Sequence, residues 1–571
     1  MWSSERGAGS WIDDPRIVLL AIALLGVVFL VLGVLVPPKD VFFSCDGGSK
    51  YILTRAFLQH DPEWPFLPYP GRFLDPEGHY FPIRGFFSVG FGGHYFSAFP
   101  VYFPILSAPG YALFGFRGLF LLPWAGGIIA LWLFSRLGVH LGWTVRRRLA
   151  GVLLLGAATP LGFYCCTFWE HVPAVALLLG GIVVLLGREG LGGSRRRCFA
   201  AGLLLGLSGF LRLEALWIGG AVLAALAITP SIRRDAGVRS LPLLALGFGG
   251  AVLLLAGANA LIYGSPIGTQ IFANVIETSQ PRAQVLQRLV AGVSAPAAWV
   301  SLALAILALG AIPGRNARSI RLVLFAGLLY PIGRMLLRET IPPHSYRTLI
   351  GVLEGAPFFF LLPLVGRRTA GDAPAAAHAV FLGRIAALAF LGVILTSPVD
   401  GGLQGGSRLL LPVVVIALAA VLTRLAETPY GTRSDRWHRT ALIATLLVAI
   451  PLSSRALPHL FYRKLEIDHP ALEETRRLPG EIVLLTNSYM SQGLAATYWE
   501  RPMYQVWDQT SILDLLDRLA AAGGREALMI SIANVRTPAR LPTSTDEPAR
   551  WVRKEQRQVT EYQFDLYQRV R

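Results

Sequence analysis

Long apolar segments recur along most of this chain. Runs of about 15–23 residues with few charges follow one another from Ile17 to Leu457, and about 20 such residues in a helix cross the hydrocarbon core of a bilayer. A backbone in lipid must satisfy its own hydrogen bonds, so such runs are helical. The sequence therefore predicts an all-α polytopic membrane protein. We expect its first run, 17–36, to be a retained span and not a signal peptide, because it lacks a small-residue cleavage site.

Positive charge is distributed in a way that fits a membrane protein. The formal net charge is +17, which in a soluble protein would suggest nucleic acid. Here, however, the arginines form short clusters between apolar runs, and such clusters hold loops on the cytoplasmic side. We therefore expect membrane lipids as partners and no nucleic acid. The clusters lie at 146–148, 195–197, 233–239, 315–321, 367–368 and 433–439.

Placing all six clusters in the cytoplasm determines the path of the chain. The first span leads outward and the span at 119–137 returns, so residues 37–118 form a long external loop. The run 98–115 is apolar, but three prolines interrupt it, and we expect helices along the outer interface there. The stretch 198–229 begins and ends on one side, which predicts two short helices with a turn near 211–214. Further spans are expected at 149–162, 171–187, 240–262, 290–312, 320–337, 348–366, 377–396, 408–424 and 440–456, giving about 13 in total.

The transmembrane domain is thus predicted to cover residues 1–456, and the less apolar tail, 457–571, to form a small α/β domain outside the membrane. GEIVLLTNS and EALMISIAN are typical of strands. Between them, TSILDLLDRLAAAGG is typical of a helix, with Ser511 as the expected N-cap and glycines at its end. No glycine-rich phosphate loop joins these elements, so we expect an accessory or partner-binding domain and not a nucleotide site.

Polar side chains of both signs gather on the predicted outer face. A charge at hydrocarbon depth costs about 2.5–3.5 kcal/mol, so such residues usually line a cavity walled by protein. Cations there suit the phosphate of a lipid-linked anion, and acids suit proton or metal chemistry. The candidate site residues are Asp46, Lys50, Arg55, Glu170, His171, Arg212, Glu214, Arg334, Tyr346, Arg347 and Arg408.

Each candidate also has a purely structural interpretation. Asp46 is suited to cap the helix that follows it, with Lys50 as its partner one turn later. Arg212 and Glu214 fit an interfacial turn, while Arg334 and Arg408 are placed to reach lipid headgroups. What favours a functional site is that these residues share one side of the membrane.

Several motifs carry a resemblance to a known superfamily. They are SCDGGSKYILTRAFLQ after the first span, PILSAPGYALFGFRGLF before the second, GLSGFLRLEAL, ANALIYGSP and GGLQGGSRLLLP. Over its full length the chain resembles the GT-C superfamily of integral-membrane glycosyltransferases, which includes protein O-mannosyltransferases and aminoarabinose transferases. Many members have two adjacent acids where this chain has Cys45-Asp46. We therefore expect no cofactor, with a divalent metal as the weaker alternative.

The resemblance implies an inverting glycosyltransferase of a bacterial inner (plasma) membrane, with its active site outside the cytoplasm. The donor would be a polyprenyl-phosphate sugar and the acceptor an unidentified glycan, lipid or protein. Asp46 would be the general base, with Glu170 as the second acid. Arg212 would bind the donor phosphate, assisted by Lys50, Arg55, Arg334 and Arg408; His171, Glu214, Tyr346 and Arg347 would line the cavity.

Two other classes of function stay open at this stage. One is a transporter or flippase of a lipid-linked or anionic solute, for which an internal repeat and a site near the bilayer midplane would be typical. The other is a non-catalytic scaffold of envelope assembly, which the single acid of the first loop allows. An O-antigen-type polymerase or ligase would want its large external loop late in the chain, whereas here that loop is early.

Overall fold

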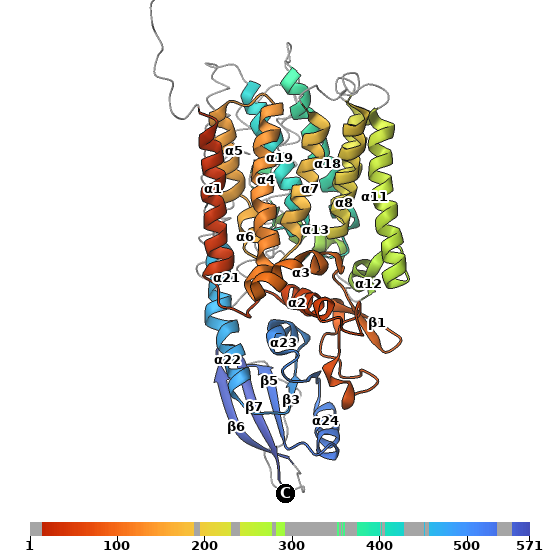
Figure 1. Ribbon diagram of the computed structural model, residues 1–571, viewed down its shortest axis with the longest axis vertical. Helices are drawn as coiled ribbons and strands as arrows, with labels where there is room; N and C mark the ends of the chain where they lie inside the picture. Colours follow the sequence, from red (N-terminus) through yellow and green to blue (C-terminus); the bar gives the residue numbers. More distant parts are fainter. Residues whose placement is uncertain are drawn as a thin grey trace, which may run out of the picture.

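The computed structural model describes residues 14–187, 194–229, 240–276, 281–291, 351–352, 356, 358–359, 374–399, 401, 406–427, 450, 456–533 and 551–570. In this part of the chain a bundle of helices occupies one end of the molecule and a sheet domain the other, with short helices between them (Figure 1). The chain is a membrane protein, and among the described residues four helical segments are long and apolar enough to cross a bilayer. These are Arg16–Leu35, Tyr102–His140, Leu241–Tyr263 and Ala377–Thr396.

Among the described residues the bundle helices follow the predicted spans, except that the span predicted at 149–162 is interrupted at 158–160. They are α1 (Arg16–Leu30) with η2 (Val31–Leu35), α4 (Leu121–His140), α5 (Val145–Ala157), α6 (Leu161–Cys165), α7 (His171–Leu186), α8 (Arg195–Leu211), α9 (Ala215–Ile228), α11 (Ser240–Tyr263), α18 (Pro374–Thr396) and α19 (Leu411–Glu427). The predicted break within 198–229 is confirmed, because α8 ends at Leu211 and α9 begins at Ala215. The predicted spans 290–312, 320–337, 348–366 and 440–456 lie wholly or largely outside the described residues. The total of about 13 spans therefore stays a prediction.

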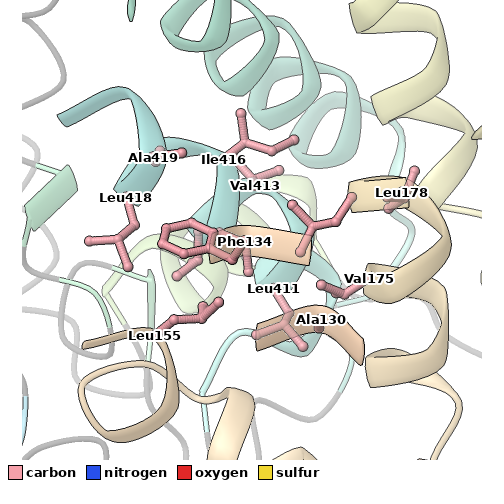
Figure 2. Close-up of a cluster of buried hydrophobic side chains, with 14 of the residues drawn as sticks. Ala130, Phe134, Leu155, Val175, Leu178, Leu411, Val413, Ile416, Leu418 and Ala419 are labelled. Carbon is pink, nitrogen blue, oxygen red and sulfur yellow. The ribbon is translucent and has the colours of Figure 1, made fainter. Parts of the chain in front are cut away.

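Helix α19 lies at the centre of the bundle core. It is apolar on every side, and its residues from Leu411 to Leu422 are nearly all inaccessible to solvent, as expected of a helix surrounded by others. Figure 2 shows it packed against Phe134 of α4, Leu155 of α5 and Leu178 of α7. The short turn η7 (Arg408–Leu410) leads directly into α19. The rigid core therefore determines where the Arg408 backbone stands.

Two short helices lie across the lower end of the bundle, between it and the sheet domain (Figure 1). They are α2 (Cys45–Leu58) and α3 (Tyr102–Phe114), and the turn η5 (Gly115–Phe120) connects α3 to α4. A methyl group on Gly118 would lie 1.8 Å from the Gly110 carbonyl oxygen, so α3 and η5 pack this closely only with glycine there. The ANALIYGSP motif secures the same region: Asn259 accepts a hydrogen bond of 2.8 Å from the Tyr102 hydroxyl, and the Tyr263 hydroxyl accepts one of 2.9 Å from the Val101 amide.

The loop after α2 contains a small hairpin that the sequence interpretation did not predict. Strand β1 (Ser88–Phe91) pairs antiparallel with β2 (His94–Ser97). The connecting residues Gly92 and Gly93 have φ values of 58° and 78°, a backbone that suits glycine in a two-residue turn. The remaining short elements of the described residues are η3 (Pro70–Phe73), η4 (Gly85–Phe87) and α12 (Gly268–Ile276) outside the bundle, and α13 (Arg282–Ala291), whose Val285 and Leu289 belong to the bundle core.

The C-terminal domain contains a five-stranded sheet in the order β4-β3-β5-β7-β6. Strands β4 (Met503–Gln505) and β5 (Glu526–Ile532) flank β3 (Ile482–Leu485) in parallel, and β7 (Tyr562–Arg569) pairs antiparallel with both β5 and β6 (Trp551–Val559). The helical elements are α21 (Ala456–Tyr462), η8 (Arg463–Asp468), α22 (His469–Arg477), α23 (Ser488–Gly493), η9 (Ala495–Thr497) and α24 (Gln509–Ala521). The two predicted strands and the helix between them are confirmed.

The predicted cap of that helix was wrong. Its N-cap is Asp508 and not Ser511. The Asp508 carboxylate accepts a 2.7 Å hydrogen bond from the Ser511 amide, and the Ser511 hydroxyl accepts one of 3.1 Å from the Asp508 amide. Serine thus occupies the third helical position of a reciprocal capping box, where a hydroxyl replaces the usual Glu or Gln.

The external loop and the C-terminal domain share one hydrophobic core. The Tyr498 hydroxyl donates to the Pro68 carbonyl (2.7 Å), the Tyr504 hydroxyl donates to that of Gly71 (3.0 Å), and the Gln505 amide donates to that of Tyr80 (2.9 Å). The boundary at 456/457 stays a prediction, but the first loop folds against the last domain.

Asp75 is the residue on which this loop depends. Its fully buried carboxylate accepts hydrogen bonds from the Tyr69 hydroxyl (2.7 Å) and from the amides of His79 (2.9 Å) and Tyr80 (2.7 Å). We predict that Asp75→Ala costs about 1–3 kcal/mol for each buried donor that loses its partner. Faster proteolysis of the loop should follow. The exposed neighbour Glu77 provides the control, and equal proteolysis of Asp75→Ala and Glu77→Ala would contradict this role.

Candidate active site

Glu170 is the centre of a buried charge cluster at the lower end of the bundle. It is the residue before α7. One carboxylate oxygen is paired with the Lys50 ammonium, and the other accepts a 2.8 Å hydrogen bond from Arg212. Arg212 is also paired with Glu214 at 2.6 Å. The side chains of Glu170, Lys50 and Arg212 are 3%, 1% and 6% exposed, so these four charges are compensated almost without water.

The local structure accounts for this convergence. Arg212 lies at the break between α8 and α9, with an extended backbone (φ −145°, ψ 118°), at the same end of the bundle as the start of α7. Lys50 is on α2, and its ammonium lies 4.6 Å from the ring centroid of Phe99.

Burial alone would raise the pKa of Glu170, but Lys50 and Arg212 outweigh burial and hold that pKa below its ordinary range.

Asp46 and Arg408 form the second ion pair. Arg408 donates through NH1 to the Asp46 carboxylate, and the two side chains are 14% and 9% exposed. The structural interpretation of Asp46 as a helix cap with Lys50 as its partner was wrong. The N-cap of α2 is Ser44, Asp46 lies in the first turn, and Lys50 pairs with Glu170. Asp46 and its partner are 362 residues apart in the chain.

A small apolar and aromatic environment holds Arg408 in place. Its guanidinium lies 4.9 Å from the ring centroid of Trp169. The segment before it is bound to α6, because the Tyr164 hydroxyl donates a 2.8 Å hydrogen bond to the Gly406 carbonyl. Gly406 has φ 128°, and a methyl group there would lie 2.5 Å from Pro160. Gly401 of the same stretch also has a positive φ, 69°, and a methyl group there would lie 2.8 Å from Leu409, so two described glycines of GGLQGGSR occupy positions that disfavour a side chain.

His171 lies between the two ion pairs. Its ring stacks on Tyr164 with centroids 5.2 Å apart and lies 5.5 Å from the ring of Trp169. The side chain is buried, yet neither ring nitrogen has a hydrogen-bond partner among the described residues, and neither does Nε of Arg408. An unpaired buried polar group costs about 1–3 kcal/mol. Three such atoms around Trp169 point to a site that is completed by a ligand.

The cluster is balanced in charge. It contains three acids and three cations: Asp46, Glu170, Glu214, Lys50, Arg212 and Arg408. An entering anion therefore competes with these carboxylates for the cations. Among the described residues, two carboxylates pair with Arg212 and one pairs with Arg408. An anion would therefore replace the carboxylate on Arg408 more easily than those on Arg212.

The other predicted site residues lie elsewhere or outside the described residues. The Arg55 guanidinium lies 4.6 Å from the ring centroid of Trp499 in the C-terminal domain. Arg334, Tyr346 and Arg347 are outside the described part of the chain. Sequence reasoning did not assign Tyr164 or Trp169 to the site, although both belong to the YCCTFWEHV stretch that contains Glu170.

The residues of the cluster do not fit a divalent metal. Both oxygens of Glu170 are held by cations, and Asp46 is held by Arg408. Across the described ranges, no group of three or more His, Cys, Asp or Glu side chains could hold a metal ion. All four cysteines are free thiols.

Comparisons with known proteins give solved structures only. No family model and no curated protein matches the chain. ArnT from Cupriavidus metallidurans, bound to undecaprenyl phosphate, is 13% identical, with 96% of this chain and 97% of that chain covered and a TM-score of 0.42. The Archaeoglobus fulgidus oligosaccharyltransferase in its apo form is 12% identical, with 91% and 70% covered and a TM-score of 0.49.

The Glu170 cluster gives a direct test by substitution. Glu170→Ala leaves two buried cations without this carboxylate, and we predict a loss of about 3–5 kcal/mol in folding free energy. The double variant Lys50→Met with Glu170→Gln should recover much of that loss, because both substituted side chains are neutral and neither leaves a buried charge at position 50 or 170. Thermal unfolding of the purified protein in detergent measures both. A double variant no more stable than Glu170→Ala would contradict the ion-pair account.

Proposed function

We propose that this protein is a GT-C-type glycosyltransferase that transfers a sugar from a polyprenyl-phosphate-linked donor to an acceptor outside the cytoplasm. The observation that carries the proposal is the buried cluster of cations and acids where an apolar bundle meets an interfacial helix. A polyprenyl chain requires lipid, whereas its phosphate requires cations that are shielded from water. The lower end of the bundle offers both within one small region.

Arg408 is the proposed ligand of the donor phosphate, ahead of Arg212. Among the described residues its guanidinium makes one ion pair and its Nε has no partner, and its side chain is the most exposed of the three cations. A planar guanidinium binds a phosphate through two parallel hydrogen bonds, which are stronger than neutral ones. Arg212 and Lys50 would then add positive potential from behind, held in place by Glu170. The role proposed for Glu170 is therefore to position cations, and not to act as a second acid.

Donor binding would release the general base. When the phosphate takes the place of Asp46 on Arg408, the Asp46 carboxylate becomes free to accept a proton. The acceptor hydroxyl then attacks the anomeric carbon, its proton passes to Asp46, and the bond from that carbon to the phosphate oxygen breaks. Polyprenyl phosphate leaves with the bonding electrons, and Arg408 stabilises the charge that develops on it. Attack opposite the leaving group inverts the anomeric configuration.

His171 would contact the bound substrates. A neutral imidazole offers one donor and one acceptor nitrogen, and both are unpaired here. A sugar carries hydroxyl groups that serve both nitrogens. In this proposal His171 orients a hydroxyl of the donor or the acceptor beside the Arg408–Trp169 pair, and no metal ion takes part.

The proposed location is a bacterial inner membrane, with the cluster and the C-terminal domain on the outer side. The arginines 146–148 begin α5 and the arginines 195–197 begin α8. Both helix starts lie at the end of the bundle opposite α2 (Figure 1). Arginine clusters mark the cytoplasmic side, so the charge cluster is assigned to the other side.

Sugar transfer itself tests the proposal. We expect the purified protein in proteoliposomes to transfer label from one member of a panel of polyprenyl-phosphate hexoses and pentoses to an envelope extract, with release of polyprenyl phosphate. Movement of the labelled lipid across the bilayer without transfer would favour a transporter. If the protein neither moves the labelled lipid nor transfers the sugar, a scaffold is favoured.

Asp46 and Arg408 provide a sharper prediction because their substitutions should act in opposite ways on binding. Asp46→Asn should lower transfer by about 10²–10⁴-fold, the usual contribution of a general base. The same change should tighten undecaprenyl phosphate binding, since Arg408 no longer has a carboxylate to exchange. Arg408→Gln should weaken that binding by roughly 10- to 100-fold, as expected for a lost charge-assisted hydrogen bond.

Binding of labelled undecaprenyl phosphate to the purified variants measures these effects. Asp40→Asn serves as the control, because Asp40 pairs with Arg476 of the C-terminal domain and not with the cluster. Weaker lipid binding in Asp46→Asn would show that the Asp46 carboxylate and the lipid phosphate do not compete for Arg408. The proposed replacement of one by the other would then be wrong.

A further inference from the structure

The helix that carries Asp46 and Lys50 is held from its opposite face by the C-terminal domain. Asp46 and Lys50 are one helical turn apart, so they share one face of α2, directed to Arg408 and Glu170. At 100° per residue, Gly48 and Arg55 lie on the other face. Those two residues contact α23 and Trp499.

Gly48 makes the closest of these contacts. A methyl group in place of its hydrogen would lie 1.8 Å from the carbonyl oxygen of Gln492 and 2.6 Å from the carbonyl carbon. Real side-chain carbons do not approach a backbone oxygen so closely. The two backbones therefore touch, and any larger residue at position 48 forces α2 and α23 apart.

Ser49 and Gln492 add a direct bond across the same contact. The Ser49 hydroxyl donates a hydrogen bond of 2.6 Å to the side-chain oxygen of Gln492, and both residues are fully buried. The Gln492 amide nitrogen in turn donates to the Ser488 carbonyl at 3.2 Å. The Ser49 hydroxyl is thus oriented by a side chain that is itself fixed within α23. One residue further along α2 is Lys50.

We propose that the C-terminal domain positions the active-site helix, through a clamp formed by Gly48, Ser49 and Gln492. Gln492 is then a positioning residue that acts on Asp46 and Lys50 through α2 and does not touch substrate. The catalytic part of this inference rests on the glycosyl transfer proposed above, whereas the clamp itself does not. It gives the C-terminal domain a role in turnover in addition to any partner that it binds.

Position matters because a reacting group works only within a narrow range of distance. A displacement of about 1 Å lowers a catalysed rate by about 100-fold. Arg408 and Arg212 are carried by η7 and by the α8–α9 turn, and not by α2 or α23. Loss of the clamp should therefore lower turnover without weakening the binding of undecaprenyl phosphate.

Two glycine-to-alanine variants of the full-length protein test this inference. Gly48→Ala should lower sugar transfer by about 100-fold, leave undecaprenyl phosphate binding no weaker than in the wild type and increase amide hydrogen exchange in residues 45–58. Gly493→Ala is the matched control, because a methyl group there meets nothing within 4 Å, and it should change none of the three. Rates are referred to the fraction of enzyme that binds the lipid, which separates misplacement from misfolding.

The hydrogen bond gives an independent test if Gly48→Ala fails to fold. Ser49→Ala and Gln492→Met should each lower turnover, and the double variant should be no slower than the slower single variant, since both remove one interaction. Gln492→Glu retains an oxygen acceptor for Ser49 and should restore part of the rate. Single variants whose effects simply multiply in the double variant would overturn the pairing.

The outcomes separate this inference from the proposed function. Unchanged exchange in residues 45–58 of Gly48→Ala would overturn the clamp, and increased exchange with undiminished transfer would overturn its positioning role. If the wild-type protein transfers no sugar, the proposed function is wrong. Amide hydrogen exchange alone then tests whether the clamp exists. Increased exchange in Gly48→Ala but not in Gly493→Ala would then still support it.

Discussion

The contact of Glu170 with Lys50 and Arg212 is the interaction on which the lower end of the bundle depends. Removing a carboxylate or an ammonium group from water costs several kcal/mol, and only a close partner offsets that cost. Lys50 belongs to α2, Glu170 precedes α7, and Arg212 lies between α8 and α9. The ion pairs therefore join three parts of the chain that the apolar core alone would not align.

The same constraint connects the structure to its proposed chemistry. A cluster in which acids and cations balance is stable while it is closed, and an entering anion competes with a carboxylate for its cation. Replacement of the Asp46 carboxylate by the donor phosphate on Arg408 would bind the donor and free Asp46 in one step. The base would thus become available only when a donor phosphate is present, and the water-excluded surroundings would strengthen the charges that act on the leaving group.

Much of the bundle was predictable from the sequence because span length and arginine placement are local signals. The break at 211–214 followed from the requirement that 198–229 return to one side, and the strand and helix of the tail followed from their residue patterns. The cap at Asp508 was missed because Ser511 also fits a cap on spacing alone. The hairpin at 88–97 was missed because its two adjacent glycines were not weighed as a turn signal.

The site was predictable only as a set of residues. Asp46, Glu170, Arg212 and Arg408 were recognised as polar residues on one side of a membrane, but their pairing depends on contacts across hundreds of residues. Neighbouring spacing suggested Asp46 with Lys50, whereas the fold offers each a partner of better geometry from another helix. The contact between α2 and α23 had no sequence signal at all, since glycine, serine and glutamine are common in many other contexts.

The most direct test of the account is an experimental structure of the protein with undecaprenyl phosphate. The account predicts a phosphate within hydrogen-bonding distance of the Arg408 guanidinium, near Trp169 and His171, with the Asp46 carboxylate turned away from Arg408 towards open space beside the lipid. A phosphate bound elsewhere, with the Asp46–Arg408 pair still closed, would contradict it.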